Sequence, residues 1–179
     1  MKTAIKTLIA STLTAIVLTS SALTTIAKDK PATSISAPVK FNKVVVTGNA
    51  NVVLVQGSRE DIKSFDAIDE NSTSVKQKGY TLYINSTDKS TIYVYVKDLQ
   101  RIDVANTANV KTRGNFDLAV LQVFLKDEAK ANLNATVGSL YTDISGSSDL
   151  KMAGSSKEHA LVRHDVSKLN LNDFVIAKL

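Results

Sequence analysis

Gly48-Asn49-Ala50-Asn51-Val52 is the first copy of a five-residue pattern that recurs along this chain of 179 residues. Each copy begins with a turn-forming or small residue, carries Ala or Ser at its third place and ends in Val or Leu. Asn or Asp usually precedes the final residue. The other four copies are Asn106-Thr-Ala-Asn-Val110, Ala129-Lys-Ala-Asn-Leu133, Gly146-Ser-Ser-Asp-Leu150 and Asp165-Val-Ser-Lys-Leu169. Such a repeat predicts stacked β-turns, each delivering one apolar residue into a shared core.

The spacing of the copies predicts how the chain is wound. The apolar end positions are Val52, Val110, Leu133, Leu150 and Leu169, so the first gap is by far the longest. The later copies follow one another at roughly 20 residues, which is typical of one turn of a β-solenoid. Asn and Asp tolerate the left-handed backbone that such turns require, and their side chains are expected to hydrogen-bond along the coil axis.

The first and largest gap contains strand patterns without the repeat. Tyr80–Ile84 follows a Lys78-Gly79 turn, and Thr91–Val96 alternates aliphatic and aromatic residues. These patterns predict an antiparallel meander in the first half of the chain. Both prolines, Pro31 and Pro38, precede the strands, and a body without proline suits a sheet whose ladder uses every backbone N–H.

The N-terminal segment is predicted to lie outside the fold. Lys2 and Lys6 precede an apolar stretch, and small residues then offer cleavage after Ala22 or Ala27. Residues 1–27 therefore read as a secretory signal peptide rather than a retained transmembrane anchor. Residues 28–38 follow as a linker and residues 39–179 as a single domain. The mature protein is expected in the periplasm, at the outer-membrane surface or outside the cell, with no membrane span.

Composition excludes several classes of site and partner. The chain has no Cys, so lipidation at a processing cysteine, disulfides and thiol catalysis are excluded. The formal charge is +5, to which Lys2 and Lys6 of the N-terminal segment contribute. The other basic residues are scattered along the sequence rather than clustered, which predicts no nucleic-acid partner.

The order of turn glycines and core aliphatics resembles a known family. The residues concerned are Phe41-x-x-Val-x-Val-x-Gly-x-x-Asn-Val-x-Leu-x-Gln-Gly57, Gly79-x-x-Leu-x-Ile84 and Ile144-Ser-Gly-Ser-Ser-Asp-Leu150. Together with the signal peptide they are similar to the head GIN domain, a family of exported proteins common in Bacteroidetes and labelled putative auto-transporter adhesins. The resemblance spans residues 39 to 179.

The resemblance implies an all-β fold, in which strands form a right-handed parallel β-solenoid or β-helix-like coil, and a surface or envelope location. It brings no catalytic motif, so it transfers no catalytic residue, cofactor or metal ligand. The chain departs from the family at Asn106, Ala129 and Asp165, which stand where the repeat otherwise has glycine. These departures bear on the regularity of the later coils.

Titratable residues offer one candidate for a metal or acid–base site. His159 and His164 are the only histidines and lie beside Glu158 and Asp165. Their odd spacing sends the two rings to opposite faces of a strand, which argues against shared ligation. A solvated edge of the coil is the preferred interpretation.

Two further constellations are weighed and set aside. A Ser-His-Asp triad would need a nucleophile in a Gly-x-Ser-x-Gly turn, which is absent, and the serines read as turn residues. Calcium binding by the side-chain oxygens of the repeat would need several Asp per turn with paired glycines, which the chain lacks. A ladder of hydrogen bonds between stacked Asn and Asp side chains fits the sequence better. The repeat oxygens concerned belong to Asn51, Asn109, Asn132 and Asp149.

Three tyrosines are the candidate ligand-binding residues. Strand alternation places Tyr93 and Tyr95 opposite Ile92, Val94 and Val96, and Tyr83 opposite its aliphatic neighbours. If the aliphatics face the core, the three rings share one outer face, where they offer flat apolar area and a hydroxyl to a sugar or a protein. The alternative is that they pack against a neighbouring strand or the linker.

Three functions follow as hypotheses. The preferred one is a non-enzymatic envelope or surface domain that binds an unknown glycan or envelope protein in the manner of an adhesin. The second is a structural scaffold that self-associates as a homo-oligomer through an exposed coil end, where the apolar residues are Phe174, Val175, Ile176 and Leu179. The third is a polysaccharide-acting enzyme, which would need clustered carboxylates on one sheet face.

Overall fold

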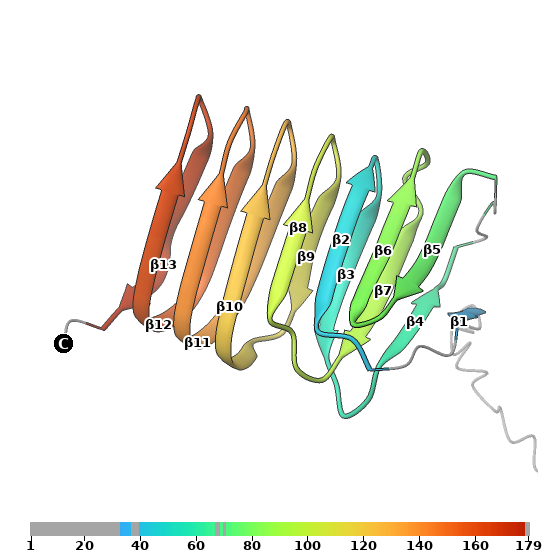
Figure 1. Ribbon diagram of the computed structural model, residues 1–179, viewed down its shortest axis with the longest axis horizontal. Helices are drawn as coiled ribbons and strands as arrows, with labels where there is room; N and C mark the ends of the chain where they lie inside the picture. The colour runs from blue at the N-terminus through green and yellow to red at the C-terminus, as the bar shows by residue number, and fades with distance from the viewer. Residues whose placement is uncertain (1–32, 37–39, 67–68, 70, 178–179) are drawn as a thin grey trace, which may run out of the picture.

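The computed structural model describes residues 33–36, 40–66, 69 and 71–177, and none of them is helical. Their strands join in one 13-stranded sheet with both parallel and antiparallel pairs. The sheet curls on itself as a half-barrel, so that Figure 1 shows two layers of strands facing one another. The predicted all-β class is confirmed. The predicted signal peptide, residues 1–27, lies outside the described residues.

The front layer in Figure 1 runs through β5, β6, β2, β8 and β10 and continues in the second halves of β11 and β12. The bounds are Thr73–Lys78 for β5, Thr81–Ser86 for β6, Lys43–Gly48 for β2, Arg101–Val104 for β8, Phe116–Leu125 for β10, Lys130–Ile144 for β11 and Asp149–Arg163 for β12.

The rear layer runs through β4, β7, β3 and β9, continues in the first halves of β11 and β12 and ends at β13. Its remaining bounds are Asp61–Ser64 for β4, Thr91–Val96 for β7, Asn51–Gln56 for β3, Asn109–Arg113 for β9 and Lys168–Ile176 for β13. Strand β1, Thr33–Ser36, falls inside the segment expected to be a linker and pairs with β4.

The chain stacks in rungs, each of which consists of a front strand, a turn and a rear strand. Successive rungs pair in parallel. The apolar repeat position follows this register: Val52 pairs with Val110, Val110 with Ala131, Ala131 with Leu150 and Leu150 with Leu169. Four of these side chains are at most 3% exposed and Leu169 is partly buried, so they line the core as expected.

One copy of the repeat is wrong in the sequence-based alignment. The third rung begins at Asp127, so its copy is Asp127-Glu-Ala-Lys-Ala131 and not Ala129–Leu133. The alignment followed the Asn before the final aliphatic, whereas the fold constrains the first place. That place needs a positive φ, and Asp127 has a φ of 59°. Leu133 is buried as well, further along the same strand.

The turns that join front to rear strands are stabilised by a ladder of side chains. Their first residues all have φ between 57° and 74°: Gly48, Asn106, Asp127, Gly146 and Asp165. The Asn106 amide oxygen accepts the Gly48 N–H at 3.1 Å, and the Asp127 carboxylate accepts the Asn106 N–H at 2.8 Å. The Asp165 carboxylate accepts the Gly146 N–H at 2.9 Å. Hydrogen bonding along the coil axis therefore occurs at the first place of the repeat. The ladder predicted at the fourth place is wrong: Asn51, Asn109, Asn132 and Asp149 lie in strands, and none of their side chains hydrogen-bonds to another of the four.

The third place of the repeat packs beneath each turn. All five residues there are small and fully buried: Ala50, Ala108, Ala129, Ser148 and Ser167. A larger side chain would collide with the neighbouring rung, because rungs are about 4.8 Å apart. Ala or Ser is therefore a spacing requirement of the stack.

The interval between β3 and β8 is not a meander. Antiparallel pairing is confirmed there for β5 with β6 and for β4 with β7. However, β6 and β7 do not pair with one another. Instead β6 runs parallel to β2 in the front layer and β7 parallel to β3 in the rear layer. The β2–β3 rung therefore sits between the β6–β7 rung and the β8–β9 rung, although it precedes both in sequence.

The last described rungs pack through His159. Its imidazole Nε2 lies 2.9 Å from the Thr142 hydroxyl, and its ring meets the ring of Phe174 edge-on at 6.3 Å between centroids. Burial lowers the pKa of His159 below its ordinary value of 6.5. The neutral ring is thus the form that fits this packing.

The turn ladder predicts a graded series at Asp127. The change Asp127→Ala removes the side-chain acceptor and places a residue with poor left-handed tolerance at φ 59°. We expect a loss of about 2 kcal/mol in the free energy of unfolding, from left-handed strain and a lost hydrogen bond. Asp127→Gly relieves the strain and should lose only about 1 kcal/mol. Asp127→Asn should stay within about 0.5 kcal/mol of the parent by urea denaturation, and equal losses for all three would contradict the ladder.

The packing of His159 predicts a pH dependence of stability. Because the folded pKa is lower than the unfolded one, the unfolded chain binds the proton first as the pH falls. The contribution of this ring is present in full above its ordinary pKa and is lost progressively as the pH drops below it. His159→Gln should flatten the dependence of unfolding free energy on pH in urea denaturation carried out from neutral to mildly acidic pH. An unchanged slope in that variant would show that His159 does not contribute.

Candidate functional site

The structure separates the three candidate tyrosines. Tyr83 lies on β6 of the front layer, where it is 43% exposed, and pairs with Val45 of β2. Tyr93 and Tyr95 lie on β7 of the rear layer. Their aliphatic neighbours are buried as predicted, so each ring does point away from the core. The prediction of one shared outer face is wrong, because β6 and β7 belong to opposite layers.

The two rear tyrosines are partly covered by β4 and the residue after it. Phe65 meets the Tyr93 ring edge-on at 5.0 Å between centroids. The Lys63 ammonium lies 5.2 Å from the centre of the Tyr95 ring and 3.1 Å from the Asp61 carboxylate. Both tyrosines are half-buried, and their outer ring faces are engaged within the chain.

The front layer carries a more compact cluster, which we call the front patch: Lys43, Arg101, Asp103, Phe124 and Tyr141. Asp103 on β8 binds two cations, the Arg101 guanidinium at 2.7 Å and the Lys43 ammonium at 2.9 Å. All three side chains are part-exposed, at 22% to 36%. The ion pairs hold the donors in place while leaving them open to solvent.

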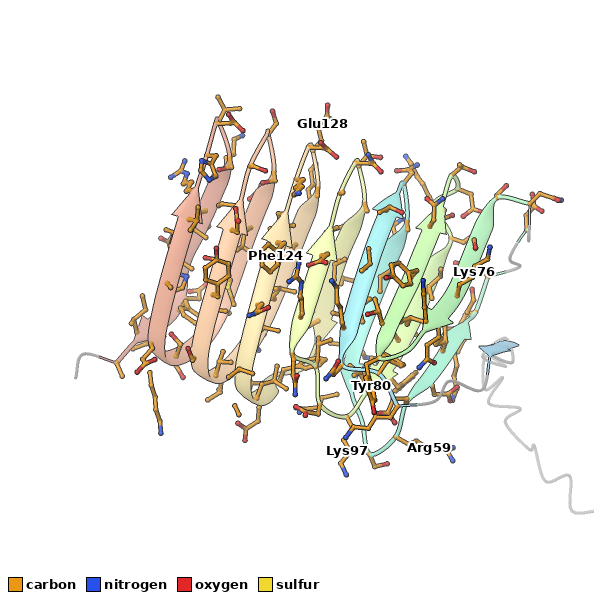
Figure 2. The ribbon with its side chains drawn as sticks, viewed as in Figure 1. Arg59, Lys76, Tyr80, Lys97, Phe124 and Glu128 are labelled. Atoms are coloured by element: carbon orange, nitrogen blue, oxygen red, sulfur yellow. The ribbon has the colours of Figure 1, made fainter. Side chains whose placement is uncertain are left out.

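The aromatic half of the front patch is stacked on the charged half. The Arg101 guanidinium carbon lies 3.9 Å from the centre of the Phe124 ring, within the range of a cation–π contact. The Tyr141 ring follows on the next strand, 5.5 Å from Phe124 between centroids. Figure 2 shows Phe124 near the middle of the front layer.

Shallow hollows flank Arg101. One of about 200 Å³ lies between β2, β8 and β10 and is lined by Val45, Arg101, Asp103 and Phe124 among others. Another of about 250 Å³ is lined by Asn42, Lys43, Gln100, Arg101, Val120 and Gln122. The patch is therefore an open surface with relief, suited to an extended ligand rather than an enclosed small molecule.

Cross-strand register places Tyr83 in line with the patch. Tyr83, Val45, Asp103 and Phe124 occupy one row across four adjacent strands. At about 4.8 Å per strand, the row spans about 14 Å. Sequence reasoning found Tyr83 but missed all five residues of the front patch: Lys43, Arg101, Asp103, Phe124 and Tyr141. The sequence signal that could have found them is the repeat length: residues one rung apart in sequence, such as Asp103 and Phe124, become neighbours on adjacent strands.

The other residues that the sequence offered as candidates lie in packing contacts, turns or strands and do not gather into a site. His159 is half-buried against Phe174, and His164 is exposed just before the turn that begins at Asp165, so the two do not form a site. Ser147 and Ser148 lie in the turn that begins at Gly146, whereas Ser155 and Ser156, which also read as turn residues, lie within β12. Among the described residues no three His, Asp or Glu side chains gather as metal ligands would. Within the same residues, no helix has the length and apolar character to span a membrane.

In the part of the chain that the structure describes, two carboxyl groups have a pKa below the ordinary value, and both belong to turns. The Asn71 N–H lowers the pKa of Asp69, and the Ser90 N–H lowers the pKa of Asp88. Each carboxylate accepts backbone and hydroxyl hydrogen bonds in the turns that flank β5, β6 and β7. These shifts therefore mark turn formation and not acid–base chemistry.

Solved structures share this fold at low sequence identity. A putative adhesin from Bacteroides fragilis has a TM-score of 0.62 and 15% identity, over 76% of this chain and 68% of that one. A putative lipid binding protein from Parabacteroides distasonis has a TM-score of 0.60 and 13% identity, over 80% and 74%. A putative adhesin from Parabacteroides merdae has a TM-score of 0.54 and 16% identity, over 80% and 72%. At these identities the likeness concerns the fold alone.

A family model confirms the resemblance seen in the sequence. No curated protein matches the chain. The family described as putative auto-transporter adhesin, head GIN domain, matches residues 40–179, which is all but the N-terminal segment and covers every rung of the sheet. The chain belongs to this head GIN domain family of putative auto-transporter adhesins.

Proposed function

We propose that the protein is an exported, non-enzymatic binding domain of the cell surface or envelope, and that it holds a glycan across the front patch. The carrying observation is the stack of Arg101 on Phe124, 3.9 Å from the ring centre, with Tyr141 beside it. Adhesin-like surface binding agrees with the family.

The chemistry of the front patch fits a sugar chain. The Phe124 and Tyr141 rings are half-buried, and Arg101 covers one face of Phe124, so their exposed parts together with the more exposed Tyr83 offer apolar area to the C–H face of a pyranose. Arg101 and Lys43 donate hydrogen bonds, and Asp103 accepts them, so hydroxyl groups on either side of the ring find partners. Because Asp103 already orients both cations, ligand binding orders few additional side chains.

The rungs support a further proposal about the scaffold. We propose that the parallel rungs from β8–β9 to β12–β13 form a right-handed β-solenoid. Parallel strands that feed one sheet take right-handed connections in nearly all proteins, which supports this hand. A crystal structure of residues 40–179 tests it, and rungs of left-handed connection would contradict it.

The proposal predicts that the front patch determines binding. Phe124→Ala and Arg101→Ala should each weaken the affinity for a captured oligosaccharide by about tenfold, since each removes a contact worth about 1.4 kcal/mol. The measurement is an array of neutral oligosaccharides, followed by titration calorimetry on the best ligand. Tyr83→Ala should lower the affinity for long oligosaccharides more than the affinity for short ones, because Tyr83 lies about 14 Å from Phe124 and only a long ligand reaches both.

The rear tyrosines supply a matched control. Tyr93→Ala with Tyr95→Ala removes two aromatic rings from the opposite layer and should leave oligosaccharide affinity unchanged. Thermal unfolding of each variant separates binding losses from folding losses. If the rear pair weakens binding as much as the front variants do, the site belongs to the rear layer. If polysaccharide substrates are turned over by the purified protein, the non-enzymatic assignment fails.

A second candidate function is a self-associating envelope scaffold. Strand β13 is the last of the described sheet and pairs on one side only, with β12. Large aliphatic side chains are exposed at this end of the stack: Leu161 44%, Val166 71%, Val175 66% and Ile176 44%. Of the residues expected to form a pairing end, Phe174 is buried, and Leu179 lies outside the described residues.

Solution mass decides this second candidate. A β13 edge that pairs with another copy should give concentration-dependent association by sedimentation equilibrium. Val175→Lys with Ile176→Lys should abolish it, because charges on an exposed edge oppose pairing. A strict monomer at millimolar concentration would exclude the scaffold.

A further inference from the structure

Basic side chains that are scattered in the sequence come together on the outer surface of the rear layer. Four neighbouring strands, β9, β11, β12 and β13, each present two outward residues there, and we call these eight the rear lattice. They are Asn109 and Lys111, Lys130 and Asn132, Asp149 and Lys151, and Lys168 and Asn170. Each strand contributes one Lys and one residue with an amide or carboxylate.

The lysines alternate in position from strand to strand. Asn109, Lys130, Asp149 and Lys168 share one row, and the next row holds Lys111, Asn132, Lys151 and Asn170. The lysines therefore zigzag across the layer, with about 4.8 Å between strands and about 6.8 Å along them. Diagonal neighbours are about 8 Å apart, close to the screening length in physiological salt, so their repulsion is tolerable.

Most of the rear lattice is not committed to contacts within the chain; the exception is Asn170, whose amide oxygen accepts the Asn172 N–H at 3.0 Å. Among the described residues, none of its four lysines forms a salt bridge, and the side-chain amides of Asn109 and Asn132 form no hydrogen bond. Seven of its eight side chains are exposed, and Asp149 is partly exposed. Arg113 adds a further exposed cation on β9. A hollow of about 80 Å³ borders the lattice between Asn51, Asn109 and Lys111.

Protection of a sheet edge explains only part of this charge. Lysines on an exposed edge strand oppose aggregation, and Lys168 on β13 fits that role. Lys111, Lys130 and Lys151 lie on strands paired on both sides, where no edge needs protection. Each of these lysines pairs across strands with Asn or Asp and not with another lysine, so the arrangement gathers positive charge without placing like charges opposite one another.

We propose that the rear lattice binds an acidic polysaccharide, whose carboxylates meet the lysines and whose hydroxyl groups meet the intervening amides. Four lysines against one aspartate leave the lattice net positive, complementary to a polyanion. The eight residues of the lattice are polar, the neighbouring Val53 is only 3% exposed, and the exposed Val175 and Ile176 lie at the far end of β13. A membrane surface would instead be met by exposed aromatic or aliphatic side chains.

Nucleic acid is disfavoured by the same surface. Single strands stack their bases on exposed aromatic rings, and the nearest rings in this layer, Tyr93 and Tyr95, are partly covered by Phe65 and Lys63. Phosphate recognition favours the bidentate guanidinium, whereas the lattice uses lysine with amides. Its surface is distinct from the front patch, so the two sites can be inactivated separately.

The test uses polygalacturonate as the probe and dextran as its neutral counterpart. The full chain should bind polygalacturonate in affinity electrophoresis at low salt. This binding should weaken as NaCl is raised above the physiological level, and dextran should not be bound. The triple change Lys111→Gln, Lys130→Gln, Lys151→Gln should weaken this binding at least tenfold and reduce its salt dependence. The control triple Lys76→Gln, Lys78→Gln, Lys97→Gln removes the same charge elsewhere, at positions that Figure 2 partly labels, and should change affinity less than twofold.

Several results would overturn the proposal. These are an equal loss for both triples, which would show a mere net-charge effect, and no binding of polygalacturonate at low salt. Tighter binding to vesicles of anionic phospholipid or to a single-stranded oligonucleotide would name a different partner class. Phe124→Ala should retain polygalacturonate binding, so failure of the front patch and failure of the rear lattice are distinguished. Urea denaturation of both triples confirms that they fold alike.

Discussion

The fold depends on a left-handed turn repeated at the start of each rung. Only a residue that tolerates positive φ can occupy that place, and where it is Asn or Asp its side chain accepts the N–H of the preceding turn. The small buried residue at the third place of the repeat lets rungs approach to strand spacing. Two local rules thus fix the register of neighbouring rungs, and register fixes which side chains become neighbours on each outer surface.

The two outer surfaces carry different side chains because the register places residues from the same position of successive rungs next to one another on one layer. On the front layer it aligns Tyr83, Val45, Asp103 and Phe124 in one row. On the rear layer it brings lysines from four strands beside amides. Neither surface shapes the core, which consists of aliphatic side chains and Phe41, Phe116 and Phe174. Surface chemistry can therefore vary without altering the fold.

Sequence reasoning reached the all-β class, the parallel stacking and the line of core aliphatics, because these depend on short-range patterns. It misaligned the third copy, since Asn132 resembles the repeat Asn while the true turn residue is Asp127. It placed Tyr83 with Tyr93 and Tyr95, because alternation assigns a side of one strand but not the layer to which that strand belongs. It judged the lysines scattered, since side chains separated by one whole rung look unrelated until the rung length is known.

The position of the β2–β3 rung has a consequence for the order of folding. The later rungs join segments that are close in sequence, such as Lys130 with Asp149, so they close short loops and can form quickly. The β2–β3 rung must settle between β6–β7 and β8–β9, and it pairs with β8–β9 across the long interval from Lys43 to Arg101. Its loop closure is slower and entropically more costly. Strands β2 and β3 are thus synthesised well before their native neighbours, and until those arrive they remain apolar strands with unpaired edges.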